Sequence, residues 1–485
     1  MNPTFPVIFL AAAILRLIAA IWNTGFLALD DYYIFSFSVP AQAMTADPPD
    51  NFFFSLRSPL VRILMDGLSL GAFKLGFTDP LNQIRFIYVF FGLYSLAGVY
   101  YTYKLIKLTS QERTANIALL LASFHFLLPY VSTRAMIENL SAPFLMIAAY
   151  SVTVYYLQNK KIFLVIAVFA IALASLFRFQ AGSVILVPLV IIFIRKNYSD
   201  LIHFGYASLF SFFVTGGIDF FLRGEFHGTL LKYIQYNLSH SNEYGVSPFY
   251  TYFLLMIAVT IPPVLLSRFK NFSFINIYKP LFPALLMFIV FVLLHSAVPH
   301  KEERFLIPVF YLFLALISPL YEEAFKKSWR KLLFISLNLI LLCLITFFPF
   351  QQNTTGIVRF YHTHTELNSL FIYKDSLGHF PVAYAYRSPV SFHFVKESVP
   401  VNLPVGEKES STKTNKWIDD KEQIQTMNCK ATIAVREDYL PNFPLSYKKI
   451  AVFESSFPEK ILLIINPKAN KRRGAIHLFI PEGCP

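Results

Sequence analysis

Five titratable side chains lie next to one another between two long apolar segments of the sequence. They separate the apolar stretches 282–298 and 305–320, and they are His300, Lys301, Glu302, Glu303 and Arg304. Hydrocarbon excludes ionisable groups unless they are paired or face a water-filled cavity, so the cluster is a candidate functional site. A charged loop that only separates two helices is the simpler alternative. Such a loop needs few charges, and an acid, a base and a histidine together favour binding or catalysis.

A pair of carboxylates follows the first apolar segment. Asp30 and Asp31 precede two tyrosines within a polar stretch, residues 23–60. Two adjacent carboxylates do not both ionise readily without a nearby cation, so one of them can be held as a general base. Aspartate is also a common helix N-cap. The pair is equally consistent with a cap for the segment that follows.

Arginines occur at membrane depth elsewhere in the chain. Arg16 lies within the first apolar segment, Arg134 begins the fourth, and Arg178 lies between the fifth and the sixth. Several guanidinium groups on one face would suit a phosphate or diphosphate, because their planar forks of donors match phosphate oxygens. The alternative for each arginine is a structural ion pair with a buried acid.

Side chains that can bind sugar hydroxyls occur between residues 236 and 245, and aromatic side chains that can cover a sugar ring follow between residues 249 and 253. A solvated loop followed by an aromatic belt at a membrane interface would look similar. The candidate acceptor or loop contacts are Asn242, Glu243, Tyr244 and Tyr250, together with Arg57 from the first polar stretch.

The elements that must position these residues are predicted to be membrane helices. Of the 485 residues, 55% are hydrophobic and only 15% are charged, so the chain is more apolar than a soluble protein of this length. With roughly 20 apolar residues per crossing, the sequence predicts about eleven spans. They are expected near residues 5–22, 84–106, 112–131, 136–157, 161–177, 181–194, 201–222, 250–267, 281–298, 305–320 and 331–349.

Basic residues fall in every second loop between these spans, which makes those loops cytoplasmic by the positive-inside rule. The acidic pair, the 300–304 cluster and the C-terminal residues are then expected on the opposite side. Contact with anionic lipid accounts for much of the formal charge of +13, so no nucleic-acid partner is expected. The first apolar stretch has no basic flank and no cleavage site, which predicts a retained helix.

The three cysteines, Cys343, Cys429 and Cys484, lack the spacing of a metal site. Cys429 and Cys484 could pair in an oxidising compartment, and two unpaired thiols are an equal alternative. No metal and no cofactor are expected.

The composition turns polar after the last predicted span. Residues 1–350 are expected to form the catalytic membrane domain, and residues 351–485 a small extracytoplasmic α/β domain. Short strands are predicted at Phe380–Tyr386, Ala431–Val435, Lys449–Phe453 and Ile461–Ile465. The charged, Ser/Thr-rich stretch 405–416 is predicted to be a mobile loop.

Taken in order, these blocks resemble the membrane mannosyltransferases of glycosyltransferase family 22. The family's hallmark is a His-Lys-Glu-x-Arg-Phe block followed by apolar residues and a proline, and here it spans His300–Pro308. Supporting matches are Asp30-Asp31-Tyr32-Tyr33 after the first helix, Leu56-Arg57-Ser58 downstream, Thr133-Arg134, and a loose match over Tyr244–Tyr252. In the last block Ser247 and Phe249 depart from the usual His or Glu and Trp. The resemblance covers residues 1 to about 320.

The resemblance implies a mainly α, polytopic helical bundle of the GT-C type with its active site on the extracytoplasmic face. It implies an inverting transfer of a hexose, mannose before others, from a polyprenyl- or dolichyl-phosphate donor to a glycan or glycolipid acceptor. Asp30 or Asp31 would be the base. The donor phosphate would contact His300, Lys301, Arg304, Arg134 and Arg178, and Glu302 or Glu303 would hold the basic side chains in place.

A different class of function remains open from the residues themselves, because charged groups within spans also mark the paths of transporters and flippases. Transporters often contain paired repeats with broken helices, and no such pairing is evident here. Another GT-C transferase with a different sugar or acceptor is the nearest enzymatic alternative. The compact length favours a bacterial inner membrane, and an endoplasmic reticulum membrane is the alternative.

Overall fold

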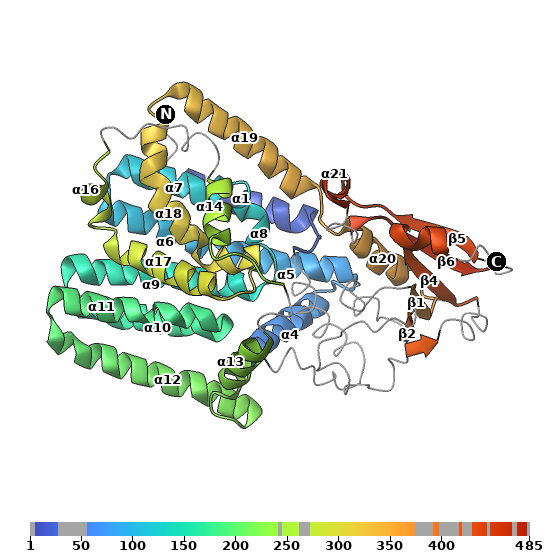
Figure 1. Ribbon diagram of the computed structural model, residues 1–485, viewed down its shortest axis with the longest axis horizontal. Coiled ribbons are helices and arrows are strands. Elements are labelled where there is room, and N and C mark those ends of the chain that lie inside the picture. The colour runs from blue at the N-terminus through green and yellow to red at the C-terminus, as the bar shows by residue number, and fades with distance from the viewer. Residues whose placement is uncertain are drawn as a thin grey trace. The chain divides into compact units, whose positions relative to one another are not determined.

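The computed structural model describes residues 5–27, 56–240, 245–260, 272–373, 391–396, 417–419, 429–443, 447–467 and 473–482. Over these residues the chain is mainly helical, with one six-stranded sheet near its C-terminal end (Figure 1). Two compact units can be distinguished. The first comprises residues 1–19, 55–61 and 89–345, and the second comprises residues 20–54, 62–88 and 346–485. The expected domain boundary at residue 350 stays a prediction.

Within the described residues, the α-helices are α1 (Phe5–Trp22), α4 (Pro59–Lys74), α5 (Pro80–Tyr94), α6 (Leu96–Thr109), α7 (Glu112–Phe124), α8 (Leu128–Val131), α9 (Ile137–Gln158), α10 (Lys161–Phe177), α11 (Leu186–Arg195), α12 (Leu201–Arg223), α13 (Gly228–His240), α14 (Thr251–Val259), α16 (Phe274–Tyr278), α17 (Phe282–Ala297), α18 (Ile307–Ala324), α19 (Ser328–Phe347), α20 (Gln352–Thr363) and α21 (Phe457–Ile465). Two 3₁₀ turns matter for the site, η1 (Phe179–Ile185) and η3 (Glu303–Leu306).

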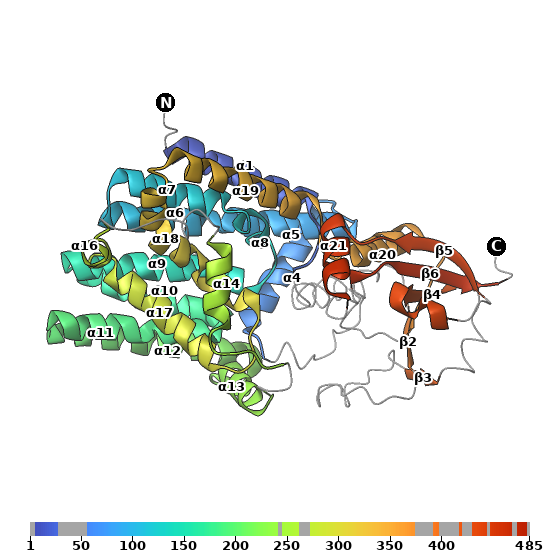
Figure 2. The same cartoon turned by 45° about the horizontal axis from the view of Figure 1, so that its top comes forward.

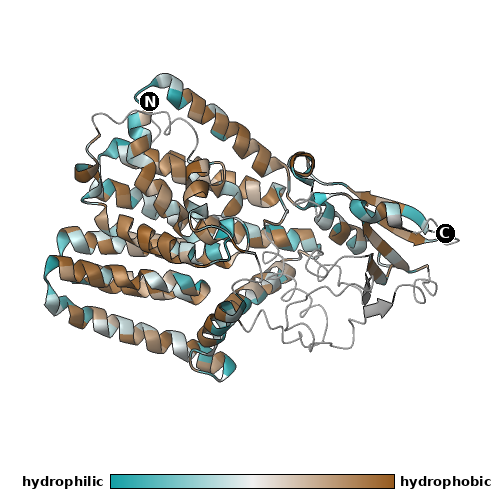
Figure 3. Ribbon diagram, in the orientation of Figure 1, coloured by the Kyte–Doolittle hydropathy of each residue, from teal (hydrophilic) through white to brown (hydrophobic). Residues whose placement is uncertain are grey.

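Helices α9 and α18 form the centre of the first unit. Helix α9 packs against α6, α10, α17 and α18, and α18 also packs against α6 and α7. Figures 1 and 2 both show α9 and α10 running side by side. Most of α9 and α18 is buried, which fits their apolar residues on every side, whereas α12 exposes phenylalanines along its length. Brown, hydrophobic ribbon accordingly dominates these helices in Figure 3.

Six helical segments of the described chain are long and apolar enough to cross a membrane. They are Phe5–Trp22, Pro80–Thr109, Ile137–Gln158, Tyr198–Arg223, Glu303–Ala324 and Ser328–Thr363, and three shorter apolar helices cover Lys161–Phe177, Phe179–Arg195 and Phe282–Ala297. Helix occurs in the described part of each predicted span, so the helical membrane class is confirmed. Residues 261–267 of the predicted span 250–267 lie outside the described residues. The count of eleven spans stays a prediction.

The second unit contains a sheet with strand order β3-β2-β1-β4-β6-β5. The strands are β1 (Ser369–Tyr373), β2 (Ser391–Lys396), β3 (Trp417–Asp419), β4 (Ala431–Arg436), β5 (Tyr447–Phe453) and β6 (Ile476–Pro481). Strands β3, β2, β1 and β4 are parallel, and β6 pairs antiparallel with both β4 and β5.

Side chains alternate between the two faces of this sheet, as the pleat requires. Leu370 and Ile372 of β1 pack with Ile357 and Tyr361 of α20, whereas Phe371 and Tyr373 pack with Phe443 on the other face. The strand is therefore buried on both sides, which is typical of a strand inside a parallel sheet.

Two of the strands expected from the sequence are observed, since β4 and β5 cover 431–435 and 449–453. The expected strand at Ile461–Ile465 is wrong, because these residues end helix α21. Ser456 and Glu459 form a capping box that starts this helix, and that local signal prevails over the β-branched composition. Residues 380–386 and 405–416 lie outside the described part of the chain.

Candidate active site

The 300–304 cluster lies between two apolar helices, as the sequence predicts. Helix α17 ends at Ala297, and η3 leads into α18, where Pro308 occupies the first turn. Proline suits that position because the first-turn amides need no intrahelical acceptor. The cluster is thus held on a short, sharply bounded connection between two membrane-grade helices.

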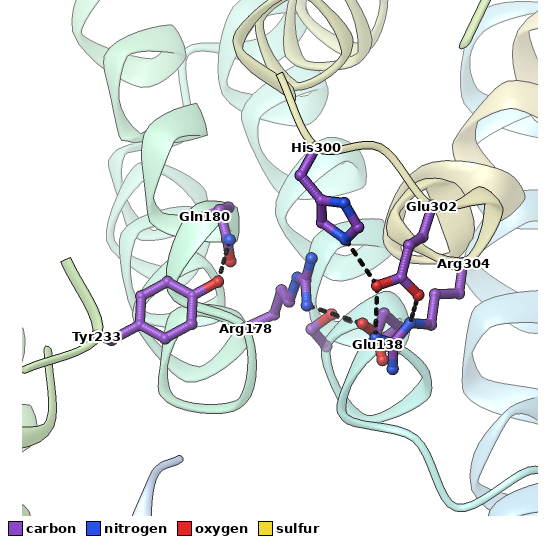
Figure 4. Close-up of polar contacts among 8 residues, drawn as sticks. Glu138, Arg178, Gln180, Tyr233, His300, Glu302 and Arg304 are labelled. Carbon is purple, nitrogen blue, oxygen red and sulfur yellow. Dashed lines mark hydrogen bonds and ion pairs between the residues drawn. The ribbon is translucent and has the colours of Figure 1, made fainter. Parts of the chain in front are cut away.

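Glu302 organises the cluster. Its Oε2 accepts a hydrogen bond from Arg304 Nε at 2.6 Å, and its Oε1 accepts one from Arg304 Nη2 at 3.0 Å. His300 Nε2 lies 3.0 Å from the same Oε1 (Figure 4). The fork of Arg304 and the imidazole therefore share one carboxylate, which fixes both side chains. Glu303 is exposed.

Lys301 joins the cluster to the segment that follows α13. Its Nζ donates to the carbonyl oxygen of Ser247 at 2.9 Å and to that of Val298 at 2.6 Å. The Ser247 amide in turn donates to the Pro299 carbonyl at 3.0 Å, and His300 Nδ1 lies 3.4 Å from the Gly245 carbonyl oxygen. Burial lowers the pKa of the Lys301 ammonium from its ordinary value. The 300–304 cluster and the candidate sugar-binding segment 236–253 are thereby brought together at residues 245 and 247.

Arg178 lies directly after α10 and forms an ion pair with Glu138, in the first turn of α9. The Nη1–Oε1 distance is 2.8 Å, and the two side chains are only 3% and 1% exposed. Arg178 also lies over the Phe305 ring, with its Cζ 4.3 Å from the ring centroid. Phe305 follows Arg304, so a cation–π contact couples the buried arginine to the cluster.

Arg178 has more donors than this pairing uses. Its Nε and Nη2 are buried and have no hydrogen-bond partner among the described residues, and the same holds for Glu138 Oε2. A buried donor without a partner costs about 1–3 kcal/mol, so such atoms call for an explanation such as a ligand. A planar guanidinium with two free donor directions is well suited to a phosphate.

A cavity of about 160 Å³ is lined by His300 of the cluster, by Phe305, over which Arg178 lies, and by Gln180. It is smaller than the roughly 300–1,000 Å³ of drug-sized ligand pockets, which suits a single small ring. Its lining comprises Gln180, Ser183, Tyr233, Tyr236, Asn237, His240, Leu294, His295, Val298, His300 and Phe305. His295 is buried, and its Nε2 has no hydrogen-bond partner in the described part of the chain.

A separate small crevice is lined by Arg178 itself. Arg57 and Leu56 line it together with Arg178, Gln180 and Tyr233. Gln180 Nε2 also donates to the Tyr233 hydroxyl, which links η1 to α13 (Figure 4). Arg57, expected from the sequence at the acceptor or in a loop, therefore lies beside the same buried arginine.

The remaining predicted residues have different positions. Arg134 is buried, donates to Thr133 Oγ1 at 2.8 Å and to the Ala19 carbonyl at 3.4 Å, and lies over the Tyr130 ring. These contacts fit a structural role, and its contact with phosphate stays a prediction. Tyr250 is exposed before α14. Asp30, Asp31, Asn242, Glu243 and Tyr244 lie outside the described residues.

Four residues at or near the site are not among those predicted from the sequence: Glu138, Gln180, Tyr233 and His295. Glu138 offered a signal, since an acid inside an apolar segment needs a buried partner. Gln180 and Tyr233 offered none, because their proximity depends on the packing of elements that are far apart in the sequence.

The model of the Alg9-like mannosyltransferase family matches residues 7–394. Among curated proteins, the chain is similar to GPI mannosyltransferase 3 of Saccharomyces cerevisiae, with 24% identity over 347 residues. That alignment covers 64% of this chain and 54% of the relative, so the chain spans about half the length of that protein.

Among solved structures, the chain is similar to two crystal structures of ArnT from Cupriavidus metallidurans, one bound to undecaprenyl phosphate and one in the apo state. The TM-scores are 0.62 and 0.60, with 11% and 13% identity. The first alignment covers 99% of both chains, and the second covers 98% of this chain and 97% of the other. The likeness shows the fold, a helical membrane architecture of the GT-C type as predicted.

Proposed function

The chain belongs to the Alg9-like mannosyltransferase family and is a membrane glycosyltransferase, and on that premise we propose its reaction. It transfers a hexose, mannose before others, from a polyprenyl- or dolichyl-phosphate donor to a glycan or glycolipid acceptor, with inversion at the anomeric carbon. The observation that carries the proposal is Arg178, a buried arginine with two donors that have no hydrogen-bond partner among the described residues. It lies over the ring of Phe305, which lines a small cavity together with Gln180 and His300.

In this reaction an acceptor hydroxyl oxygen forms a bond to the anomeric carbon while the bond from that carbon to the donor phosphate oxygen breaks. Negative charge develops on the leaving lipid phosphate, and preorganised donors that face it lower the barrier. Arg178 would provide them. Glu138 fixes the guanidinium from behind and Phe305 from one face, so little reorganisation is needed as the charge develops.

The acceptor hydroxyl must lose its proton as it attacks. A carboxylate close to the anomeric carbon would take it, and Asp30 or Asp31 is our candidate on the strength of the family's acidic pair. The cavity of about 160 Å³ would hold the transferred sugar, whose hydroxyls would meet Gln180, Asn237 and His295. Glu302 would hold His300 and Arg304 at the donor side of the site.

We also propose on which side of the membrane the site and the C-terminal residues lie. The site and residues 351–485 would be extracytoplasmic, in a bacterial inner membrane before an endoplasmic reticulum membrane. The disulfide at Cys429 supports an oxidising compartment for the C-terminal residues, because reducing compartments keep such thiols free.

The test uses purified protein in nanodiscs with polyprenyl-phosphate-mannose and a panel of glycan acceptors. Arg178→Gln should lower transfer by about 10²–10³-fold, as expected for the loss of a key charge-stabilising donor. Asp30→Asn or Asp31→Asn should lower transfer by about 10²–10⁴-fold, as expected for the loss of a base. Arg223→Gln provides the control, because Arg223 ends α12 and donates to Thr229.

Three outcomes would contradict the proposal. The first is full activity of the Arg178 variant, and the second is full activity of both aspartate variants. The third is movement of the lipid across vesicles by the wild type without any sugar transfer, which would favour a flippase.

A further inference from the structure

Helix α21 presents an apolar face to its surroundings. Phe457, Ile461, Ile464 and Ile465 are 56%, 40%, 80% and 74% exposed. Their spacing of four, three and one residues places them on one side of an α-helix. The surfaces of soluble proteins rarely expose several large apolar side chains together. This face of α21 therefore indicates that the helix contacts an interaction partner.

The rest of the helix is fixed in a way that keeps this face outward. The Glu459 side chain is fully buried and forms a capping box with Ser456. Its Oε1 accepts hydrogen bonds from the Gln351 amide at 2.9 Å and from Arg473 Nη1 at 3.1 Å. Rotating α21 to bury the isoleucines would pull this carboxylate away from its partners. The exposure is therefore built into the fold.

The contacts of α21 place it next to the C-terminal end of α19, the apolar helix that forms the first part of the candidate span Ser328–Thr363. The Phe457 ring lies 5.9 Å from the ring of Phe348, one residue after α19 ends, and Glu459 binds the amide three residues further on. The ring centroid of Phe347 in turn lies 5.7 Å from that of Trp22, the last residue of α1. Trp22 and Phe347 are 62% and 43% exposed. Exposed aromatic rings at the ends of two apolar helices are typical of a membrane–water interface.

We propose that α21 is an interfacial helix whose apolar face enters the acyl boundary of the lipid bilayer. Its nine residues span only about 14 Å, too short to cross a membrane. Lipid is the partner that this position favours, because Phe457 of the apolar face contacts Phe348, next to the exposed aromatic pair Phe347 and Trp22. The sequence also places Lys468, Lys471 and Arg472 just after the helix, where lipid head groups would attract them. This inference does not depend on the proposed reaction.

The experiment attaches a nitroxide spin label to the full-length protein in nanodiscs of phosphatidylcholine and phosphatidylglycerol. Labels are placed by Ile464→Cys and, separately, Ile465→Cys, in a Cys343→Ala background that removes the exposed free thiol of α19. The matched control is Lys460→Cys on the same helix, where the side chain is half exposed and pairs with Glu454. Power saturation compares collisions with oxygen, which concentrates in lipid, and with a water-soluble nickel chelate.

Labels at 464 and 465 should collide with oxygen at least several-fold more than with the nickel chelate, and the label at 460 should show the reverse preference. Equal access of the nickel chelate to all three labels would overturn the proposal. Labels at 464 and 465 that neither agent reaches would also overturn it and would indicate coverage by protein, such as a second copy of the chain. All three positions are exposed, so the labels should not disturb folding, and a single gel-filtration peak verifies this.

Discussion

At the scale of single residues, the two neighbouring glutamates of the 300–304 cluster differ completely in their surroundings. Glu302 holds both Arg304 and His300, whereas Glu303 points to an exposed surface. The hallmark block of the family specifies the first glutamate and leaves the second position variable. The geometry gives a physical reason, because only Glu302 organises basic side chains.

Glu302→Gln should therefore lower sugar transfer by up to about 10²-fold, since the amide keeps the shape but releases the fork of Arg304 and the imidazole of His300. Glu303→Gln is the matched control and should remain close to wild type. Transfer rates at saturating donor, measured on both proteins together with their melting temperatures, check this. Equal losses in the two variants would contradict the role given to Glu302.

Lys301 leads to a prediction about pH. Burial lowers the pKa of its ammonium. When pH rises through that lowered pKa, the charged form that donates to the Ser247 and Val298 carbonyls is lost. The transfer activity should therefore begin to fall at a lower pH than it would if Lys301 had the pKa of an ordinary lysine. Lys301→Arg should shift this alkaline decline to higher pH, because a guanidinium stays charged.

The measurement is the pH profile of transfer for the wild type and for Lys301→Arg in the same nanodiscs. A decline that is identical in the two proteins would assign it to another group. Lys104→Arg, a change in α6, controls for general effects of replacing lysine with arginine.

At the scale of elements, the close approach of α6 and α18 depends on one glycine. A Cβ at Gly98 would lie 3.0–3.1 Å from three ring atoms of Tyr311. Real Cβ atoms rarely come so close, and Tyr311 is itself fully buried. The ring has little room to move, so a side chain at position 98 must push the two helices apart.

Gly98→Ala should therefore destabilise the protein by about 1–3 kcal/mol, as overpacking of a core does. Gly205→Ala in α12 is the matched control, because a Cβ there meets nothing within 4 Å. That change should be neutral or stabilising by up to about 1 kcal/mol, since alanine favours helix. Melting temperatures in one detergent compare the two. Equal shifts would refute the packing argument.

At the scale of the whole molecule, the alternation of basic loops predicts opposite membrane sides for two connections. Glu303, in the 300–304 cluster, should be extracytoplasmic, and Lys196, just after α11, should be cytoplasmic. Both side chains are exposed, so both positions are suitable for labelling.

In a Cys343→Ala background, Glu303→Cys should react with a membrane-impermeant maleimide in intact spheroplasts. Lys196→Cys should react only after the membrane is opened. Gel mobility after labelling with a high-mass maleimide provides the measurement. Reaction of both positions from the same side would contradict the topology, and with it the proposed extracytoplasmic site.

The sequence by itself determined the class, the family and the central motif of this protein. Apolar runs of sufficient length specify membrane helices, because an unpaired backbone is not tolerated in hydrocarbon. Helix is accordingly found in the described part of each predicted span. The 300–304 block could be predicted because its residues are contiguous, so the motif and its main internal contact, Glu302 with Arg304, are local.

Only the tertiary structure decided which distant residues meet the block. Arg178 pairs with Glu138 across 40 residues and lies over Phe305, and Gln180 meets Tyr233 across 53 residues. Such contacts depend on how α9, α10, α13 and η3 pack, and a periodic apolar pattern gives a helix but not its neighbours. The wrong strand prediction at 461–465 has a related cause. A capping box and the buried Glu459 stabilise a helix there. Burial of the Glu459 carboxylate depends in turn on its contacts with Gln351 and Arg473, which are distant in the sequence or in another element.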